Sequence, residues 1–267
     1  MTTARRIPRA MTIAGSDSGG GAGVQADLKT FAALGVYGTS VLTAITAQNT
    51  VAVTAVHEVP TDIIAAQIAA VMDDIGADAV KTGMLSSSAI VEMVAGELKR
   101  RRVRQLVVDP VMVAKSGDSL LRREAVEALR TRLVPLAAVV TPNIPEAEVL
   151  TGLKIASDSD MRRAAQQIVG MGARAVVVKG GHREGPATDL FYDGSRFQEF
   201  TAPRIETTNT HGTGCTFASA VAAGLARGMD VLDAVALAKE YVTEAIRHAF
   251  PVGRGHGPLN HFYKLWG

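Results

Sequence analysis

The chain has one cysteine, few aromatic residues and almost no net charge, and each shortage excludes a class of protein. A single cysteine, Cys215, cannot form an internal disulfide, and no Cys and His residues stand at metal-ligand spacing. These features argue against a disulfide scaffold and a structural zinc site. Aromatic residues make up 4% of the chain and the formal net charge is +2, so neither base stacking nor a basic surface field favours a nucleic-acid partner.

Long hydrophobic runs are also missing. No run reaches the roughly 18 apolar residues of a membrane span. The apolar stretch after the N-terminal arginines is interrupted at Gly15, too early for a signal peptide. We therefore expect a cytoplasmic protein that has no membrane partner. A length of 267 residues, 47% of them hydrophobic, indicates one domain over residues 1–267, with residues 1–9 as a flexible N-terminal extension.

Strand-like and helix-like segments alternate along most of the chain. Short apolar runs predict strands over residues 10–14, 41–47, 79–80, 106–109, 139–141 and 175–179. Apolar residues at helical spacing predict helices over residues 24–34, 61–74, 86–102, 122–133, 158–171, 213–227 and 231–248. Two strand-like runs around Asp193 and Gly194 predict a hairpin over residues 190–200. The order predicts a three-layer α/β/α fold with a mainly parallel central sheet and a small edge hairpin.

The first glycine-rich loop, residues 15–23, allows two interpretations. Residues 21–26 satisfy the dinucleotide-binding pattern G-x-G-x-x-A after a strand and at a helix start. A nicotinamide cofactor would also need an acidic residue at the end of the second strand, and Thr43–Gln48 offers none. The plain alternative is a tight turn. A phosphate loop of the Walker type is excluded, because no glycine is followed by lysine.

A second glycine loop lies near the C-terminus, at the start of an alanine-rich predicted helix. Around Thr213, the glycines Gly212 and Gly214 let backbone N–H groups point into a concavity where the helix dipole favours negative charge. This indicates an anion hole. At the same helix end we expect Cys215 to have a lowered thiol pKa and to act as a base. The alternative is that Cys215 is a small core residue.

Four polar residues after predicted strands could supply the rest of a phosphoryl-transfer site. Asn143 and Glu146 could hold Mg²⁺ through water, although helix capping explains the same pair equally well. Asp109 ends a strand at the edge where open α/β sheets bind ligands, or it starts a turn before proline. Lys179 could meet nucleotide phosphates, or it could be a solvated lysine.

Taken in order, six motifs resemble those of bacterial hydroxymethylpyrimidine and phosphomethylpyrimidine kinases, which belong to the ribokinase-like superfamily. They occupy residues 14–30, 81–85, 108–112, 141–147, 178–182 and 211–215. The resemblance runs from about residue 11 to the C-terminus. It implies ATP-dependent phosphorylation of 4-amino-5-hydroxymethyl-2-methylpyrimidine and then of its monophosphate, in thiamine biosynthesis.

The resemblance also implies roles for individual residues. Gln48 would bind the pyrimidine edge, and the pocket around the ring would be lined by Gly15, Asp27, Met84 and Val111. Cys215 would activate the hydroxyl group. Mg²⁺ would be served by Asp109, Asn143 and Glu146, and ATP by Lys179.

The acceptor, the catalytic activity and the oligomeric state remain open in the sequence. Many sugar kinases of the superfamily carry Asp where this chain has Cys215, which favours a pyrimidine or pyridoxal acceptor over a sugar. A pyridoxal or pyridoxine kinase is the nearest alternative, and a catalytically silent pyrimidine- or nucleotide-binding protein on the same fold is another. The resemblance also implies a homodimer.

Overall fold

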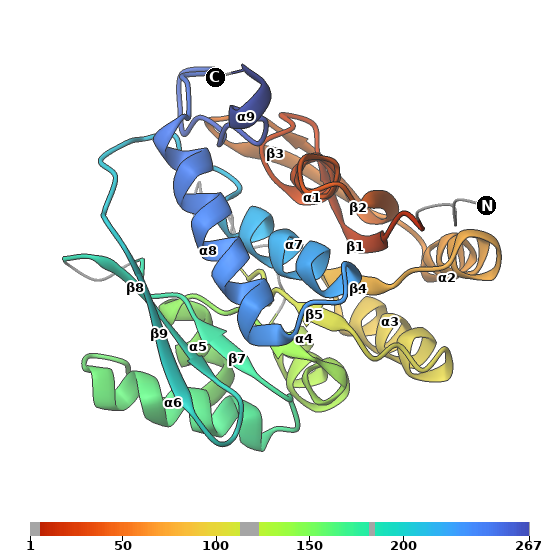
Figure 1. Cartoon of the computed structure of the whole chain (residues 1–267). Helices are drawn as coiled ribbons and strands as arrows, with labels where there is room; N and C mark the ends of the chain where they lie inside the picture. Colours follow the sequence, from red (N-terminus) through yellow and green to blue (C-terminus); the bar gives the residue numbers. More distant parts are fainter. Residues whose placement is uncertain (1–5, 113–122, 182–184, 267) are drawn as a thin grey trace, which may run out of the picture.

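A computed structural model describes residues 6–112, 123–181 and 185–266, and within these ranges the strands form one nine-stranded sheet (Figure 1). The strand order is β3-β2-β1-β4-β5-β6-β7-β8-β9. The strands are β1 (Arg9–Asp17), β2 (Tyr37–Gln48), β3 (Val53–Glu58), β4 (Ala79–Thr82), β5 (Leu106–Val108), β6 (Val139–Val140), β7 (Val176–Val178), β8 (Ala187–Tyr192) and β9 (Phe197–Ala202).

The sheet is mainly parallel, as the sequence predicts. Strands β2, β1, β4, β5, β6 and β7 pair in parallel, whereas β3 is antiparallel to β2 and the hairpin β8–β9 is antiparallel to β7. The hairpin was predicted and is confirmed. Strand β3 was missed, because its residues are mostly exposed and lack the buried, alternating apolar face that marks a strand in a sequence.

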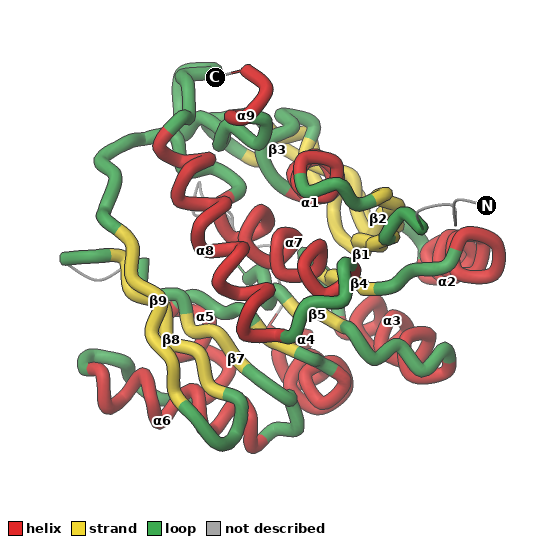
Figure 2. Tube along the Cα trace, viewed as in Figure 1, coloured by secondary structure: helices red, strands yellow, loops and turns green. Residues whose placement is uncertain are grey.

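Helices cover both faces of the sheet, so the three-layer arrangement is confirmed (Figure 2). One face carries α1 (Gly23–Ala33), α7 (Thr213–Ala226) and α8 (Val231–Arg247). The other carries α2 (Thr61–Ala70), α3 (Ser88–Arg100), α4 (Arg123–Ala128), α5 (Ile144–Thr151) and α6 (Asp158–Gly170). Short helical segments are η1 (Val71–Ile75), η2 (Leu129–Leu133), η3 (Val134–Leu136) and α9 (Tyr263–Trp266).

Alternation along the central strands produces two separate hydrophobic cores. In β5, Leu106 and Val108 join the core under α2–α6, while Val107 between them joins the core under α1, α7 and α8. Successive side chains of a strand point to opposite faces, so a strand buried on both faces must be apolar throughout. Each such side chain stabilises the fold by about 1.5–3 kcal/mol through burial.

Helix α7 lies deep between the sheet and α8 because it is built from small residues. Every residue from Thr216 to Leu225 is buried. At Gly224 an added Cβ would stand only 2.8 Å from the Cβ of Ala234 in α8, so the glycine is needed for the close contact of the two helices. This packing fixes the N-terminus of α7 at the carboxyl ends of the central strands.

The N-terminal residues are tied to the sheet sooner than a flexible extension over 1–9 would suggest. Residues 1–5 of that segment lie outside the described residues. Arg9 already begins β1, and its backbone N–H donates to the Asp78 carboxylate at 2.9 Å. Among the helices of the described ranges, none combines the length and apolar character that crossing a bilayer requires.

Candidate active site

A cavity of about 860 Å³ opens at the carboxyl edge of the parallel strands. Ligands of open α/β folds bind at this edge, and the volume suits a ligand pocket. The structure brings almost all sequence-predicted site residues into the cavity wall: Gly15, Gln48, Met84, Asp109, Val111, Asn143, Glu146, Lys179, Gly212, Thr213, Gly214 and Cys215. These residues are far apart in the chain, and strand ends and helix starts bring them together.

Asp27 is the predicted residue that does not line the cavity. It is fully buried in α1, and both of its carboxylate oxygens bind Lys81 Nζ, at 3.0 and 2.9 Å. The hydroxyls of Thr12 and Ser219 each donate to the same carboxylate at 2.6 Å. Lys81, the ion-pair partner of Asp27, lines the cavity.

The glycine loop before α7 has the geometry of an anion hole. Gly212 is the N-cap and has a φ of +81°, a conformation that glycine adopts without strain. The first backbone N–H groups of a helix have no acceptor one turn back, so those of Gly214 and Cys215 are available to an anion. A Cβ added at Gly214 would lie 3.3 Å from Lys179 Nζ, which places a cation beside the loop.

The thiol of Cys215 is less acidic than the sequence suggested. Burial raises its pKa to about 11, the carboxylates of Asp27 and Asp109 add to this effect, and the ammonium group of Lys81 acts against it. The expected lowering of this pKa is therefore wrong, because loss of hydration outweighs the helix dipole. At neutral pH only a small fraction of Cys215 is a thiolate.

Lys179 and Asp109 form a charged pair at the edge of the cavity. Lys179 Nζ lies 3.2 Å from Asp109 Oδ1, which also accepts a hydrogen bond from Thr141 Oγ1 at 3.2 Å. Although burial alone would lower the pKa of Lys179, the carboxylates of Asp109 and Glu146 raise it, so the lysine stays cationic. Asp109 is thus more than a turn residue, and Lys179 is more than a solvated lysine.

Asn143 and Glu146 form a complete capping box at the start of α5. Asn143 Oδ1 accepts from the Glu146 backbone N–H at 2.9 Å, and Glu146 Oε2 accepts from the Asn143 backbone N–H at 2.8 Å. The capping interpretation is therefore confirmed. Burial raises the pKa of Glu146 to about 7, with Lys179 opposing and Asp109 assisting. Glu146 also lines the cavity, so capping does not remove it from the site.

The donor set suits a magnesium ion that keeps most of its own ligands. In the described part of the chain no three His, Cys, Asp or Glu side chains gather into a protein-only metal cage. Mg²⁺ usually binds one or two carboxylates plus waters and substrate phosphates. Asp109 and Glu146 are two neighbouring carboxylates on the cavity wall and fit this requirement.

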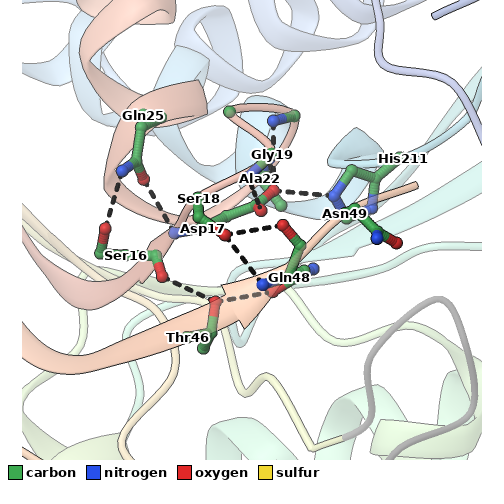
Figure 3. A network of polar contacts seen from close by, with 12 residues as sticks. Ser16, Asp17, Ser18, Gly19, Ala22, Gln25, Thr46, Gln48, Asn49 and His211 are labelled. Atoms are coloured by element: carbon green, nitrogen blue, oxygen red, sulfur yellow. Dashed lines mark hydrogen bonds and ion pairs between the residues drawn. The ribbon is translucent and has the colours of Figure 1, made fainter. Parts of the chain in front are cut away.

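Gly15, Gln48 and Met84 line another part of the cavity. At Gly15 an added Cβ would lie 2.8 Å from Met84 Cε, so the glycine makes room for this methionine. Gln48 Oε1 accepts from Thr46 Oγ1 at 3.1 Å, and its backbone is bound to Ser18 by hydrogen bonds of 2.7 and 2.8 Å (Figure 3). The Gln48 side chain is thereby held at the cavity wall with its amide N–H₂ available as a donor.

Three residues of the site were not assigned from the sequence. Lys81 lines the cavity floor, and Asp17 and His211 join the two glycine loops through a 2.8 Å contact (Figure 3). All three stand inside the motifs quoted above, next to glycines or at a strand end. Sequence spacing could not reveal their partners, which are up to 194 positions away. His182, in another motif, lies outside the described residues.

Comparison with known proteins gives a consistent set of similarities. A family model described as phosphomethylpyrimidine kinase matches residues 17–260. A hydroxymethylpyrimidine/phosphomethylpyrimidine kinase of Rhizobium meliloti is 56% identical, with 96% of this chain and 98% of the relative covered. A thiamine biosynthesis bifunctional protein of Geobacter sulfurreducens is also 56% identical, and the match covers 94% of this chain but 51% of that longer protein. Among solved structures, an ADP complex of Bacillus subtilis pyridoxal kinase has a TM-score of 0.91 at 43% identity, covering 97% of this chain and 99% of the other.

Proposed function

The chain belongs to the phosphomethylpyrimidine kinase family, and we propose from this premise how its site performs two successive phosphoryl transfers. The acceptors are 4-amino-5-hydroxymethyl-2-methylpyrimidine and then its monophosphate, and the donor is ATP. One observation carries the proposal: Lys179 stands beside the glycine loop at the N-terminus of α7, inside a cavity that also holds two carboxylates. Positioning and charge neutralisation supply most of the catalysis of phosphoryl transfer.

The charged end of the cavity serves the phosphates. Backbone N–H groups at Gly214 and Cys215 and the Lys179 ammonium group neutralise the negative charge on the transferred group. Asp109 and Glu146 would hold Mg²⁺, which supplies positive charge to the phosphates when it is bound. Asp109 also orients Lys179 through their 3.2 Å contact.

The part of the cavity lined by Gly15, Gln48 and Met84 serves the acceptor. Gln48 donates to, and accepts from, the polar edge of the ring, while Met84 and Val111 contact its apolar faces. The hydroxyl oxygen forms a bond to the γ-phosphorus as the bond from that phosphorus to the bridging oxygen breaks and ADP leaves. The hydroxyl proton passes to the thiolate form of Cys215. A phosphate acceptor is already ionised and needs no such base.

We also infer that residues 1–267 form one kinase domain, which is supported by the single sheet from β3 to β9. The enzyme is placed in the cytoplasm, in keeping with its lone cysteine, and we expect a homodimer. Light scattering on the purified protein tests the oligomeric state.

A pyridoxal kinase activity is the second candidate, because the pyridoxal kinase compared above covers nearly the whole fold. One assay separates the possibilities. ADP release is measured with the pyrimidine alcohol, the pyrimidine monophosphate and pyridoxal as acceptors, each with and without Mg²⁺. We expect transfer to both pyrimidines that requires the metal. Transfer to pyridoxal alone would replace the pyrimidine assignment, and no transfer to any acceptor would indicate a silent binding protein.

A further inference from the structure

The two glycine loops of the site pack against each other at close range. A Cβ added at Gly212 would lie 1.8 Å from the carbonyl oxygen of Gly21, and one added at Gly21 would lie 2.4 Å from Cδ2 of His211. The first loop follows β1 on the acceptor side of the cavity, and the second begins α7 on the phosphate side. Their relative position therefore sets the distance between the two substrates.

Asp17 organises the first loop from inside. Its Oδ1 accepts from the Gly19 backbone N–H at 2.8 Å, and its Oδ2 accepts from those of Ala22 at 2.8 Å and Gly21 at 3.1 Å (Figure 3). The Asp17 backbone N–H donates to Gln25 Oε1 at 2.9 Å. Asp17 is only 3% exposed, so these donors replace the water that its carboxylate would otherwise bind.

His211 gives the same carboxylate a fourth donor, and it comes from the other loop. Its Nε2 lies 2.8 Å from Asp17 Oδ2, and the side chain is buried. A carboxylate can only accept, so Nε2 carries the proton. Burial works to raise the pKa of Asp17, but the hydrogen bonds from His211 and Ala22 outweigh it and lower the pKa, which keeps the acceptor ionised. The glycine loop at residues 212–214, which begins α7, is called the anion loop below. His211 directly precedes Gly212, so this bond fixes the start of the anion loop.

The first loop is connected to the acceptor end as well. Ser18, next to Asp17, exchanges hydrogen bonds with the backbone of Gln48, and Thr46 Oγ1 binds both the Ser16 carbonyl oxygen, at 2.8 Å, and Gln48 Oε1. A continuous set of contacts, exposed at Ser18 and buried at Asp17, thus runs from Gln48 to His211 (Figure 3).

We propose that Asp17 and His211 form a positioning bridge that holds the anion loop at the correct distance from the acceptor. The inference rests on the proposed function, since it concerns the spacing of its two substrates. Neither residue touches the transferred group in this scheme. Each acts through the loops, and misplacing reacting groups by about 1 Å lowers the rate of transfer about 10²-fold.

The bridge is tested with two variants of one residue. His211→Leu removes the donor, whereas His211→Gln keeps an N–H donor at the end of a side chain of similar reach. The turnover number with the pyrimidine monophosphate is measured together with the Kd values of the pyrimidine alcohol and of ADP, each bound alone. We expect His211→Leu to lower turnover about 10²-fold with both Kd values close to wild type. His211→Gln should recover most of the lost turnover.

His261 offers a matched control. Its Nε2 lies 3.0 Å from Thr216 Oγ1, so it is a buried histidine that contacts α7. His261→Leu should lower thermal stability about as much as His211→Leu and keep turnover. Asp17→Asn should lower turnover, and the Asp17→Asn/His211→Leu double variant should be no slower than the slower single variant, because the two residues act as one unit.

Hydrogen exchange gives a readout that does not depend on activity. In His211→Leu the amides of Gly21 and Ala22 should exchange faster than in wild type and in His261→Leu. The bridge is rejected if His211→Leu turns over like wild type, or if His261→Leu loses as much turnover. An inactive wild-type protein would reject the proposed function instead, and the exchange rates would then decide on the bridge alone.

Discussion

Lys81 and Asp27 form an ion pair with no exposure to solvent, in which Nζ lies 2.9 Å from Oδ2. The pair joins β4 to α1, and the Ser219 hydroxyl connects it to α7 one turn after Cys215. Burial acts to lower the pKa of Lys81, yet Asp27 raises it well above its usual range, so Lys81 stays cationic. The charge on the cavity floor is therefore a permanent part of the fold.

The first prediction concerns the stability that this pair controls. Asp27→Asn leaves the Lys81 ammonium group buried without a countercharge and should lower the free energy of unfolding by about 3–5 kcal/mol. Adding Lys81→Met should recover most of this loss, because the neutral amide can still accept from the Thr12 and Ser219 hydroxyls. Urea unfolding measures both effects. Arg162→Gln, which breaks the exposed pair with Glu199, is the control and should cost less than about 1 kcal/mol.

The second prediction separates the anion loop from the stability of α7. Gly214→Ala adds a methyl group that points at the end of the flexible Lys179 side chain, 3.3 Å away, so the fold can accept it. Alanine is the better helix former by about 1 kcal/mol, so the melting temperature should hold or rise. Alanine keeps the backbone N–H, but its methyl group occupies space beside the Lys179 ammonium group and should displace the bound phosphate. Phosphoryl transfer to both acceptors should therefore fall about 10²-fold, as expected when reacting groups are misplaced by about 1 Å. If the Gly214→Ala variant turns over at the wild-type rate, phosphate binds elsewhere in the cavity.

The third prediction concerns Cys215 and distinguishes the two reactions. Cys215→Ala keeps the loop backbone and removes the thiolate, so transfer to the pyrimidine alcohol should fall by about 10²–10⁴. Transfer to the monophosphate should fall much less, because a phosphate monoester has a second pKa of about 6 and is ionised at neutral pH.

The pH dependence of the wild-type enzyme follows from the same residue. With a pKa of about 11 for the Cys215 thiol, the fraction of Cys215 that is a thiolate rises steadily with pH at all pH values below this pKa. Alcohol phosphorylation should therefore keep accelerating between about pH 7 and pH 9, whereas monophosphate phosphorylation should level off above about pH 7. Initial rates with each acceptor measure this. Parallel profiles in the wild type would show that Cys215 is not the base.

The fourth prediction separates the two roles of Glu146. Glutamine is also a capping-box residue and can accept from the Asn143 backbone N–H, so Glu146→Gln should keep the melting temperature. It removes the negative charge and should raise the Mg²⁺ concentration needed for half-maximal turnover. Glu146→Ala loses both roles, so it should also melt earlier, by the equivalent of about 1 kcal/mol. If Glu146→Gln has the same magnesium dependence as the wild type, Glu146 caps α5 and does not bind Mg²⁺.

The sequence predicted those parts of the fold and site that depend on local pattern. Buried strands such as β5 are apolar throughout, and the edge hairpin has a clear turn signal at Asp193 and Gly194. Because the carboxyl ends of parallel strands meet at one edge, Asp109 and Lys179 could be placed together before any coordinates.

Long-range partners and solvation could not be predicted. The family resemblance implied that Asp27 lines the pocket, and nothing near Asp27 in the chain shows that Lys81 and Ser219 surround it. The acidity of Cys215 was misjudged because the helix N-terminus is visible in the sequence, whereas the burial that opposes it arises only from packing. Strand β3 was missed because an exposed edge strand has little hydrophobic signal.

The contacts that close the site also set when it can exist during protein synthesis. Asp17 meets His211 across 194 positions, and Asp27 meets Ser219 across 192. At a translation rate of about 5–20 residues per second, the nascent chain presents its first glycine loop about 10–40 s before the anion loop is made. During that interval the sheet face that α7 will cover stays open to chaperones and to other nascent chains. A polypeptide released from the ribosome after β9 but before α7 has every strand of the sheet and no phosphate site, so such an incomplete product cannot consume ATP at this site.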